Sequence, residues 1–504
     1  MATDVRNYPK WIPKRPWRDW LPERNARLHR FVNEQLYPYS AFYRRLFDEN
    51  KIDPHSIRTI DDLRRLPFTT KRDIAPTVDN ATRHLDLVLH PDLAKLRQFA
   101  PKTKLIDLLW TKMMAGDAAA ERKVLLEYGP VHVIFTTGRT SLPTQFVYAP
   151  PDFDRLHIVG KRIADVAGIG PVARSLNVFP FAPHLAFWQV FAVGQANATL
   201  AVHTGGGKVL GTAGNIMALQ RMQPDTLIGI PGYVYHMLRQ AQTDGVRLEN
   251  MKRICLGGER VPIPLKHRLG DLCREMGRPD VVVQSVWGFT ESRHCWSECT
   301  PPDYDSTYGF HTYPDFDVFE CIDPDTCDPV GPGERGEIVY TTLSGRGSCV
   351  MRFRTGDIAE GGIVYDPCPG CGRIVPRVST NLSRRSEIAE FQFTKIRGTL
   401  VDLNGFLPSM ASVADVIEWQ LIVRKANDDP DDLDVIDLHI AVRDGCDVEA
   451  LKHTLQIKLF ADTEVTPNAI EVLPLDRLES DLGLDTQMKE LRIRDLRAQA
   501  KPIS

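Results

Sequence analysis

Short apolar runs and segments of helical spacing alternate along the middle of the chain. Between residues 125 and 380, apolar positions recur at helical spacing and are interrupted by short runs typical of strands. The clearest of these runs are Val131–Phe135, Leu176–Phe179, Leu227–Ile230, Ile254–Leu256 and Val281–Val283. Strands that alternate with helices in this way predict α/β layers.

The two ends of the chain carry other patterns. Residues 21–48 have the apolar spacing of a helical start, and residues 57–73 predict a short helix. Residues 314–365 predict strands and turns, because Asp-Pro and Gly-Pro-Gly sequences punctuate them. Residues 375–397 are rich in Arg and Ser and predict a linker. The remainder, 398–504, predicts a small α+β domain with strands at 416–423 and 435–442 and a helix at 448–460.

Length and composition limit the class of protein. A chain of 504 residues is too long for one ordinary core, and 43% apolar with 25% charged residues is typical of a soluble protein. The net charge of −3 argues against nucleic-acid binding, since there is no basic excess to neutralise phosphates. Lys10 to Arg18 is basic but rich in proline, and a solvated arm is favoured there over phosphate or membrane contact.

The location of the protein is inferred from what the chain lacks and from its thiols. The first twenty residues hold charges and prolines and no apolar core of a secretory signal. Leu185–Val202 is the most apolar stretch, but Gln189, Gln195 and Asn197 interrupt it, so it predicts a buried helix rather than a membrane span. Ten cysteines without a signal indicate reduced thiols or metal ligands. We therefore expect a cytoplasmic protein without a membrane partner.

Two loops that follow predicted strands could contact a nucleotide. Thr136 to Thr144 offers hydroxyls, small residues and backbone N–H groups that could bind phosphates, although a surface turn fits equally well. Its candidate residues are Thr136, Thr137, Gly138, Arg139 and Thr140. In the second loop, Gly257, Gly258 and Glu259 follow a strand, and paired glycines let backbone pass close to a flat ring. Taken alone, an ordinary tight turn is the favoured interpretation of that loop.

Two further motifs add carboxylates. In Trp287-Gly288-Phe289-Thr290-Glu291 the aromatic ring could cover a purine, Thr290 could bind a phosphate oxygen, and Glu291 could hold Mg²⁺, which prefers oxygen ligands. In Arg352-Phe353-Arg354-Thr355-Gly356-Asp357 the aspartate at the end of a strand could accept hydrogen bonds from ribose hydroxyls. A surface aspartate in a salt bridge is the alternative for Asp357.

The order and spacing of all four motifs resemble the adenylate-forming superfamily, specifically its phenylacetate–CoA ligase family. The resemblance covers most of the chain. It includes Leu66 to Asp73, Gln223 to Tyr233, and Leu343 to Asp357 followed by Cys-Pro-Gly-Cys-Gly-Arg. It implies a large N-terminal adenylate-forming domain, residues 1–383, and a small mobile C-terminal domain, residues 384–504. The implied reaction has two steps. The carboxylic acid first reacts with ATP and Mg²⁺ to form acyl-AMP, and the acyl group is then transferred to CoA.

The resemblance also implies roles for individual residues. Glu291 would bind Mg²⁺, Asp357 would bind the ribose, and Trp287 would stand in place of a tyrosine beside adenine. Thr136 to Thr144 would be the phosphate loop. Arg384 or Arg385 would match an arginine that precedes the domain hinge. The sequence departs from the family at Arg139, Ser141 and Leu142 in that loop, and Leu484 stands where a catalytic lysine is expected. Lys489 is the candidate substitute, although a solvated helix residue is the favoured interpretation of Lys489.

The cysteines predict a metal site. Cys368 and Cys371 lie in a Pro/Gly turn that has the form of a zinc knuckle, and a closed tetrahedral site needs two more ligands. Cys299 and His311 resemble the Cys and His of zinc-bearing family members and are the chosen pair. His294 and Cys295 are the rival pair.

An aromatic pocket is predicted for the acid. Its candidate residues, each of which could instead belong to the core, are His184, Phe187, Trp188, Tyr233, His236 and Phe289. The favoured substrate is an aryl or aryl-acetic acid. Two alternatives stay open: an adenylating enzyme whose acceptor is an amine, another small nucleophile or a carrier-protein thiol, and a degenerate member that only binds nucleotide or acyl ligands. The oligomeric state is also open, with a homodimer among the options.

Overall fold

The N-terminal part of the computed structural model is helical, as predicted. The structure describes residues 16–77, 80–136, 144–384, 394–396, 399–401, 406–425, 434–463, 466–484 and 490–496. A π-helical turn at Val32–Leu36 joins α1 (Leu21–Phe31) to α2 (Tyr37–Tyr39), and Ser40 separates α2 from α3 (Ala41–Glu49). The single helix predicted for residues 57–73 is wrong. Two short turns occur instead, a 3₁₀ turn at Ile60–Arg65 and α4 (Lys71–Ile74), because Pro67 between them interrupts the helix.

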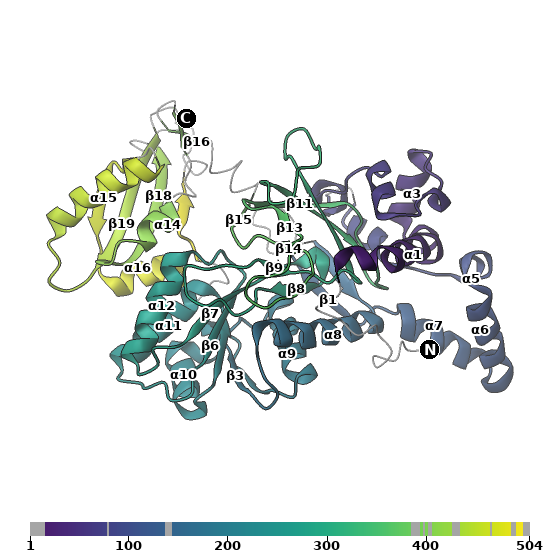
Figure 1. The fold of residues 1–504 in the computed structure, drawn as a ribbon, viewed down its shortest axis with the longest axis horizontal. Helices are drawn as coiled ribbons and strands as arrows, with labels where there is room; N and C mark the ends of the chain where they lie inside the picture. The colour runs from purple at the N-terminus through teal and green to yellow at the C-terminus, as the bar shows by residue number, and fades with distance from the viewer. Residues whose placement is uncertain are drawn as a thin grey trace, which may run out of the picture.

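A six-stranded sheet forms the centre of the large domain. Its order is β4-β3-β5-β6-β7-β8, and only the β7–β8 pair is antiparallel. Its strands are β3 (Arg174–Asn177), β4 (Leu200–His203), β5 (Thr226–Gly229), β6 (Arg253–Gly257), β7 (Val282–Phe289) and β8 (His294–Ser297). In Figure 1 this sheet lies between α8 and α9 on one side and α10 to α12 on the other. These helices are α8 (Pro150–Ala167), α9 (Leu185–Ala196), α10 (Gly207–Met222), α11 (Pro231–Thr243) and α12 (Ile263–Glu275).

All five predicted strands are present, but one predicted helix is too long. Helix α9 ends at Ala196, and Leu200–His203 forms the edge strand β4 instead of continuing the helix. Ala198 between them has a positive φ of 52°, which a helix cannot contain. Among the described helices, none combines the length and hydropathy that a membrane span requires.

Smaller sheets complete the large domain. Strands β10 (Asp317–Ile322), β11 (Gly336–Thr342), β12 (Phe353–Ala359) and β15 (Leu382–Arg384) form one antiparallel sheet. Strands β13 (Ile363–Val364), β14 (Arg377–Val378) and β9 (Phe310–His311) form another. The linker predicted for residues 375–397 is therefore wrong for its first part, where β14 and β15 pair with strands far away in the sequence.

The C-terminal α+β unit has its own core. Its strands β18 (Val416–Lys425), β19 (Asp434–Val442), β20 (Ala469–Val472) and β21 (Ile493–Asp495) form one sheet, and α14 (Phe406–Ala411), α15 (Val448–Thr463) and α16 (Leu475–Leu482) accompany it. The predicted strands and helix of this region are confirmed. Figure 1 shows the unit beside α11 and α12, where Arg268 of α12 donates to the carbonyl oxygen of Val413 at 2.6 Å. The boundary between residues 383 and 384 stays a prediction.

Candidate active site

The predicted nucleotide motifs follow the carboxyl ends of neighbouring parallel strands. Gly257, Gly258 and Glu259 end or follow β6, and Thr290 and Glu291 follow β7. Because β6 and β7 run parallel and pair directly, their carboxyl ends share one edge of the sheet, where open α/β sheets bind ligands. Two of the four sequence motifs therefore lie at one edge of this sheet.

The paired-glycine turn brings two apolar side chains close to that edge. Gly258 has a φ of 86°, which glycine adopts at little cost. A Cβ at Gly258 would lie 3.8 Å from the ring of Phe179 and 3.9 Å from the side chain of Ile230. Phe179 follows β3 and Ile230 follows β5, so three successive strands contribute to this place. Sequence reasoning missed Phe179 and Ile230 as site residues, although each ended a predicted strand.

Trp287 and Asp357 meet across two sheets. The indole Nε1 of Trp287 on β7 donates a hydrogen bond of 3.0 Å to Oδ2 of Asp357 on β12, and both residues are buried. The Trp287 ring also packs among aromatic rings 5.0–5.8 Å away, those of Phe289, Trp296, Phe310 and Phe319. Trp287 thus joins the β7 motif to the predicted ribose ligand. Its predicted position beside adenine stays a prediction.

Glu291 presents a carboxylate that the described protein leaves without a partner. The residue lies in the 3₁₀ turn Thr290–Ser292 and is only 4% exposed. Within the described ranges, no donor makes a hydrogen bond or ion pair with its side chain. Its neighbour Ser292 is satisfied by the carbonyl oxygens of Phe289 and His294, at 2.6 and 2.7 Å. A buried carboxylate left over in this way fits a divalent cation.

The ends of the predicted phosphate loop are held together. Strands β1 (His132–Phe135) and β2 (Gln145–Tyr148) form an antiparallel hairpin, and the backbone N–H of Thr136 donates to the carbonyl oxygen of Thr144 at 3.0 Å. The backbone N–H of Thr144 in turn donates to Oγ1 of Thr136 at 3.1 Å. The predicted candidates Thr137, Gly138, Arg139 and Thr140 lie outside the described residues, as do Arg385 and Lys489. Arg384 is described only as part of β15, where its backbone pairs opposite Asp357.

The predicted pocket residues of α9 pack beside the hairpin that carries the loop. Nδ1 of His184 lies 2.9 Å from the carbonyl oxygen of Phe135. The rings of Phe187 and Trp188 are 5.6 Å apart, and Trp188 lies 4.6 Å from the ring of His132 on β1. An aromatic group is therefore present between α9 and the start of the loop, and its role in binding the acid stays a prediction.

The other pocket candidates have partners of a different kind. The hydroxyl of Tyr233 accepts a hydrogen bond of 2.6 Å from Asn215, and Phe289 belongs to the aromatic core around Trp287. Nδ1 of His236 lies 3.0 Å from Oε1 of Glu479 on α16, a residue of the C-terminal unit that sequence reasoning missed. Arg239 also pairs with Glu479. Burial raises the pKa of Glu479, but His236 and Arg239 outweigh it and hold the pKa below its usual value. His236 thus joins two domains in this arrangement.

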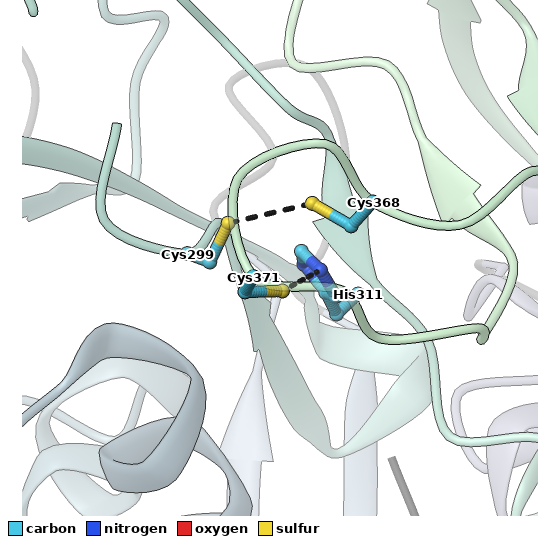
Figure 2. Close-up of side chains that lie close together, drawn as sticks. All are labelled: Cys299, His311, Cys368 and Cys371. Carbon is cyan, nitrogen blue, oxygen red and sulfur yellow. Dashed lines mark hydrogen bonds between the residues drawn. The ribbon is translucent and has the colours of Figure 1, made fainter. Parts of the chain in front are cut away.

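Three cysteines and a histidine gather as predicted. The ligand atoms of Cys299, His311, Cys368 and Cys371 all lie within 4.8 Å of one another, and three of the four residues are buried. Figure 2 shows the four side chains converging, with the Cys299 and Cys368 sulfurs 3.6 Å apart and Cys371 Sγ 3.2 Å from His311 Nε2. We call these residues the Cys₃His cluster. The rival pair lies elsewhere: His294 Nε2 faces Asp317 at 3.1 Å, and Cys295 packs against Gly288.

Comparisons with known proteins agree with this arrangement. The family model of the AMP-binding enzymes matches residues 156–352. A phenylacetate–coenzyme A ligase of Thermus thermophilus is 25% identical over 427 residues, which cover 82% of this chain and 80% of that protein. The Escherichia coli K12 protein of the same name is 22% identical and covers 70% of this chain and 68% of its own length.

Solved structures share the fold. A 2-hydroxyisobutyryl-CoA ligase in the postadenylation state superposes with a TM-score of 0.70 at 18% identity, covering 98% of this chain and 94% of that one. The same ligase in the thioesterification state gives a TM-score of 0.58, with 98% and 96% covered.

The fold, the shared sheet edge and these matches together define an adenylate-forming enzyme of the AMP-binding type. The chain is similar to AMP-binding enzymes over residues 156–352 and to phenylacetate–coenzyme A ligases over most of its length, so the resemblance predicted from the motifs is confirmed.

Proposed function

We propose that this protein is an ATP-dependent ligase that activates an aromatic carboxylic acid as acyl-AMP and transfers the acyl group to CoA. The observation that carries the proposal is the contact between the β7 motif and the predicted ribose ligand Asp357 on β12. Asp357 accepts a hydrogen bond from Trp287 of β7, and the Glu291 carboxylate, which directly follows β7, has no partner among the residues that the structure describes. Ribose and a hard cation are the ligands that such carboxylates suit.

The first half-reaction is a substitution at phosphorus. A carboxylate oxygen of the acid attacks the α-phosphorus of ATP, the bond from that phosphorus to the bridging oxygen breaks, and pyrophosphate leaves with the electron pair. Asp357 would fix the ribose, and the loop between Thr136 and Thr144 would contact the phosphates. Mg²⁺, held by Glu291, would neutralise charge on the departing pyrophosphate. These groups act by positioning and by electrostatic stabilisation.

The second half-reaction is acyl transfer to a thiol. The sulfur of CoA attacks the acyl carbon, AMP leaves, and the thiol proton passes to solvent. The contact of His236 and Arg239 with Glu479 joins the two domains in the described arrangement. Admission of CoA would then require that contact to open, since a lid over the site must move for a second substrate.

An aromatic acid is favoured by the surroundings of the site. Phe179 lies beside the glycine turn, and Phe187 and Trp188 pack beside the hairpin of the phosphate loop. Flat apolar side chains suit an aryl ring, with which offset or edge-on contacts are favourable. The names of the Thermus and Escherichia relatives are consistent with this substrate class.

A structural zinc ion in the Cys₃His cluster is part of the proposal. Tetrahedral zinc with Zn–S bonds of about 2.3 Å and Zn–N bonds of about 2.0 Å separates its ligand atoms by roughly 3.5–3.8 Å. The contacts of 3.2 and 3.6 Å in the cluster are close to that spacing. Zinc would join the loop after β8, which carries Cys299, to the turn after β13, which carries Cys368 and Cys371. It would thereby hold together segments near the β7 and β12 motifs.

The test is pyrophosphate release over a panel of carboxylic acids, with and without CoA. The proposal predicts ATP-dependent release with aryl or aryl-acetic acids and formation of an acyl-CoA when CoA is present. Release that is indifferent to CoA, with no thioester formed, would assign a different acceptor. Binding of ATP without release for any acid would refute the ligase. Zinc is tested separately by metal analysis of the purified protein, where less than about a tenth of an equivalent would exclude it.

A further inference from the structure

A buried ion pair follows the predicted Mg²⁺ ligand by two residues. Arg293 lies at the end of the turn that carries Glu291, and its Nη1 is 2.7 Å from Oδ2 of Asp152 on α8. The two side chains are 1% and 0% exposed, and we call them the Arg293–Asp152 pair. Desolvation offsets most of the attraction within such a pair, so its net contribution to stability is small. The segments that the pair joins therefore indicate its role.

Arg293 holds the end of the Glu291 turn in an uncommon conformation. Its φ is 61°, in the left-handed region that residues with a side chain seldom adopt. Its backbone N–H donates to the carbonyl oxygen of Thr290 at 3.2 Å, which closes the turn. Its own carbonyl oxygen accepts a hydrogen bond of 3.0 Å from the hydroxyl of Tyr148 on β2. Such a conformation persists where the surroundings determine it, and here both the backbone and the side chain of Arg293 are held.

Asp152 binds backbone donors of two other segments. Its Oδ2 accepts from the N–H of Ala149, directly after β2, at 2.9 Å and from the N–H of Gly347 at 2.8 Å. Gly347 lies in the turn between β11 and β12, and β12 carries Asp357. Burial alone would raise the pKa of Asp152, but Arg293 and these backbone donors outweigh it and hold the pKa below its usual value. The carboxylate therefore stays charged and keeps both segments in contact with Arg293.

The turn before β12 packs tightly around this pair. A Cβ at Gly345 would lie 2.6 Å from Nη2 of Arg293, and a Cβ at Gly347 would lie 2.0 Å from the carbonyl oxygen of Val147 on β2. Only glycine fits at such distances, so the turn is fixed against both the guanidinium and β2. The pair thus joins three segments, which carry the hairpin of the phosphate loop, the predicted Mg²⁺ ligand and the predicted ribose ligand.

We propose that Arg293 is a positioning residue for the adenylation step, and that its ion pair with Asp152 fixes the Glu291 carboxylate relative to the phosphate loop. The inference rests on the proposed function, in which Glu291 holds Mg²⁺. Arg293 is buried and bonded to protein groups, so it acts through Glu291 rather than on the substrate. Mg²⁺ demands near-ideal octahedral geometry, so a ligand displaced by roughly half an ångström binds it poorly.

A second ion pair on the same helix supplies a matched control. Arg162 of α8 donates two hydrogen bonds of 2.7 Å to Asp315, and the two side chains are 4% and 3% exposed. Asp315 lies between β9 and β10, so this pair joins α8 to a different segment. Lysine keeps the charge of arginine but lacks its planar fork. Arg162→Lys and Arg293→Lys therefore weaken the same kind of contact at similarly buried places.

The first measurement follows exchange of labelled pyrophosphate into ATP while the free Mg²⁺ concentration is varied. We expect Arg293→Lys to raise the Mg²⁺ concentration for half-maximal exchange roughly tenfold, a factor typical for loss of one hydrogen bond between charged groups. Asp152→Asn should give a similar rise, and the double variant should be no worse than either single variant, because both break one link. Acyl transfer from synthetic acyl-AMP to CoA releases no pyrophosphate and should change less than about twofold. Arg162→Lys should leave the Mg²⁺ dependence unchanged.

The second measurement needs no turnover. Ligand binding raises Tm, so the rise with MgATP compared with that for ATP and EDTA gives the part of binding that depends on the metal. In Arg293→Lys this difference should fall to less than about half of its value in the unaltered protein, and in Arg162→Lys it should persist. Each variant is compared with its own Tm without ligand, so a general loss of stability does not enter the comparison.

The outcomes separate this inference from the proposed function. The inference is overturned if Arg293→Lys keeps both the Mg²⁺ dependence and the Tm difference of the unaltered protein. It is also overturned if Arg162→Lys changes both to the same extent as Arg293→Lys, because any buried pair on α8 would then suffice. Absence of exchange with every acid in the unaltered protein would refute the proposed function, and the Tm comparison would still decide whether Arg293 positions Glu291.

Discussion

Replacing Trp287 by phenylalanine removes one hydrogen bond and keeps an aromatic ring in the core. The indole Nε1 is the donor that contacts Oδ2 of Asp357 at 3.0 Å, and both residues are buried. If Asp357 binds the ribose, this bond fixes the carboxylate in place before ATP arrives. Trp287→Phe should therefore raise KM for ATP while it changes kcat less, because the lost contact orients a binding group rather than the reacting atoms.

The size of the effect follows from the kind of bond. Hydrogen bonds to charged groups contribute about 1.5–3 kcal/mol, and each 1.4 kcal/mol is a factor of ten. The upper range applies only if Asp357 loses its orientation completely. We expect KM for ATP to rise roughly tenfold, with the remainder of the penalty seen as lower stability from the cavity beside Phe310 and Phe319.

A substrate analogue separates orientation from general damage. With 2′,3′-dideoxy-ATP the carboxylate has no ribose hydroxyl to bind, so Trp287→Phe should change KM for this analogue little. Asp357→Asn is the reference variant and should lose discrimination between ATP and the analogue. Equal effects of Trp287→Phe on both nucleotides would refute the orienting role. Normal discrimination by Asp357→Asn would instead refute the ribose assignment itself.

Three further predictions concern the metal, the domain contact and pH. Cys371→Ser should lower bound zinc from about one equivalent to less than a tenth and lower Tm by several degrees, whereas Cys446→Ser, outside the Cys₃His cluster, should do neither. Glu479→Gln should weaken the contact between α16 and α11 by about 1–2 kcal/mol. The measurement is the mean distance between dyes on α12 and α15, which should increase. An unchanged distance would show that the contact is dispensable. Burial lowers the pKa of His294 in the folded protein from its ordinary value of 6.5. As pH falls, His294 is therefore protonated in the unfolded chain before it is protonated in the folded protein. The free energy of unfolding should then decrease below pH 6.5 by up to about 1.4 kcal/mol per pH unit. His294→Gln should flatten that slope relative to the unaltered protein, and an identical slope would contradict the assignment.

The local hydrophobic pattern was sufficient to predict the strands of the central sheet. It was insufficient where the type of element depends on pairing with residues elsewhere in the sequence. The apolar run that ends in Leu200–His203 looked like one helix, because periodicity does not register the turn at Ala198. Leu382–Arg384 looked like a linker from its composition, but it pairs with β12 and becomes a strand through that partner. Element type is set by tertiary contacts in both places.

In the candidate site, too, some features follow from local sequence and others depend on tertiary contacts. The Cys₃His cluster was predicted from a turn and a resemblance, because ligand type and spacing are properties of the sequence. The contact between His236 and Glu479 joins residues 243 positions apart, and no local signal marks it. The bond from Trp287 to Asp357 was equally invisible, although each residue had been chosen separately.

The most direct test of the central claim is acid-dependent exchange of labelled pyrophosphate into ATP. This exchange requires a reversible acyl-AMP intermediate and does not require any acceptor, so it probes the first half-reaction alone. We predict exchange with at least one aryl or aryl-acetic acid, and a loss of at least about 100-fold in Glu291→Gln, in which the Mg²⁺ ligand is neutralised. Exchange at the same rate without any acid, or full exchange in Glu291→Gln, would contradict the account.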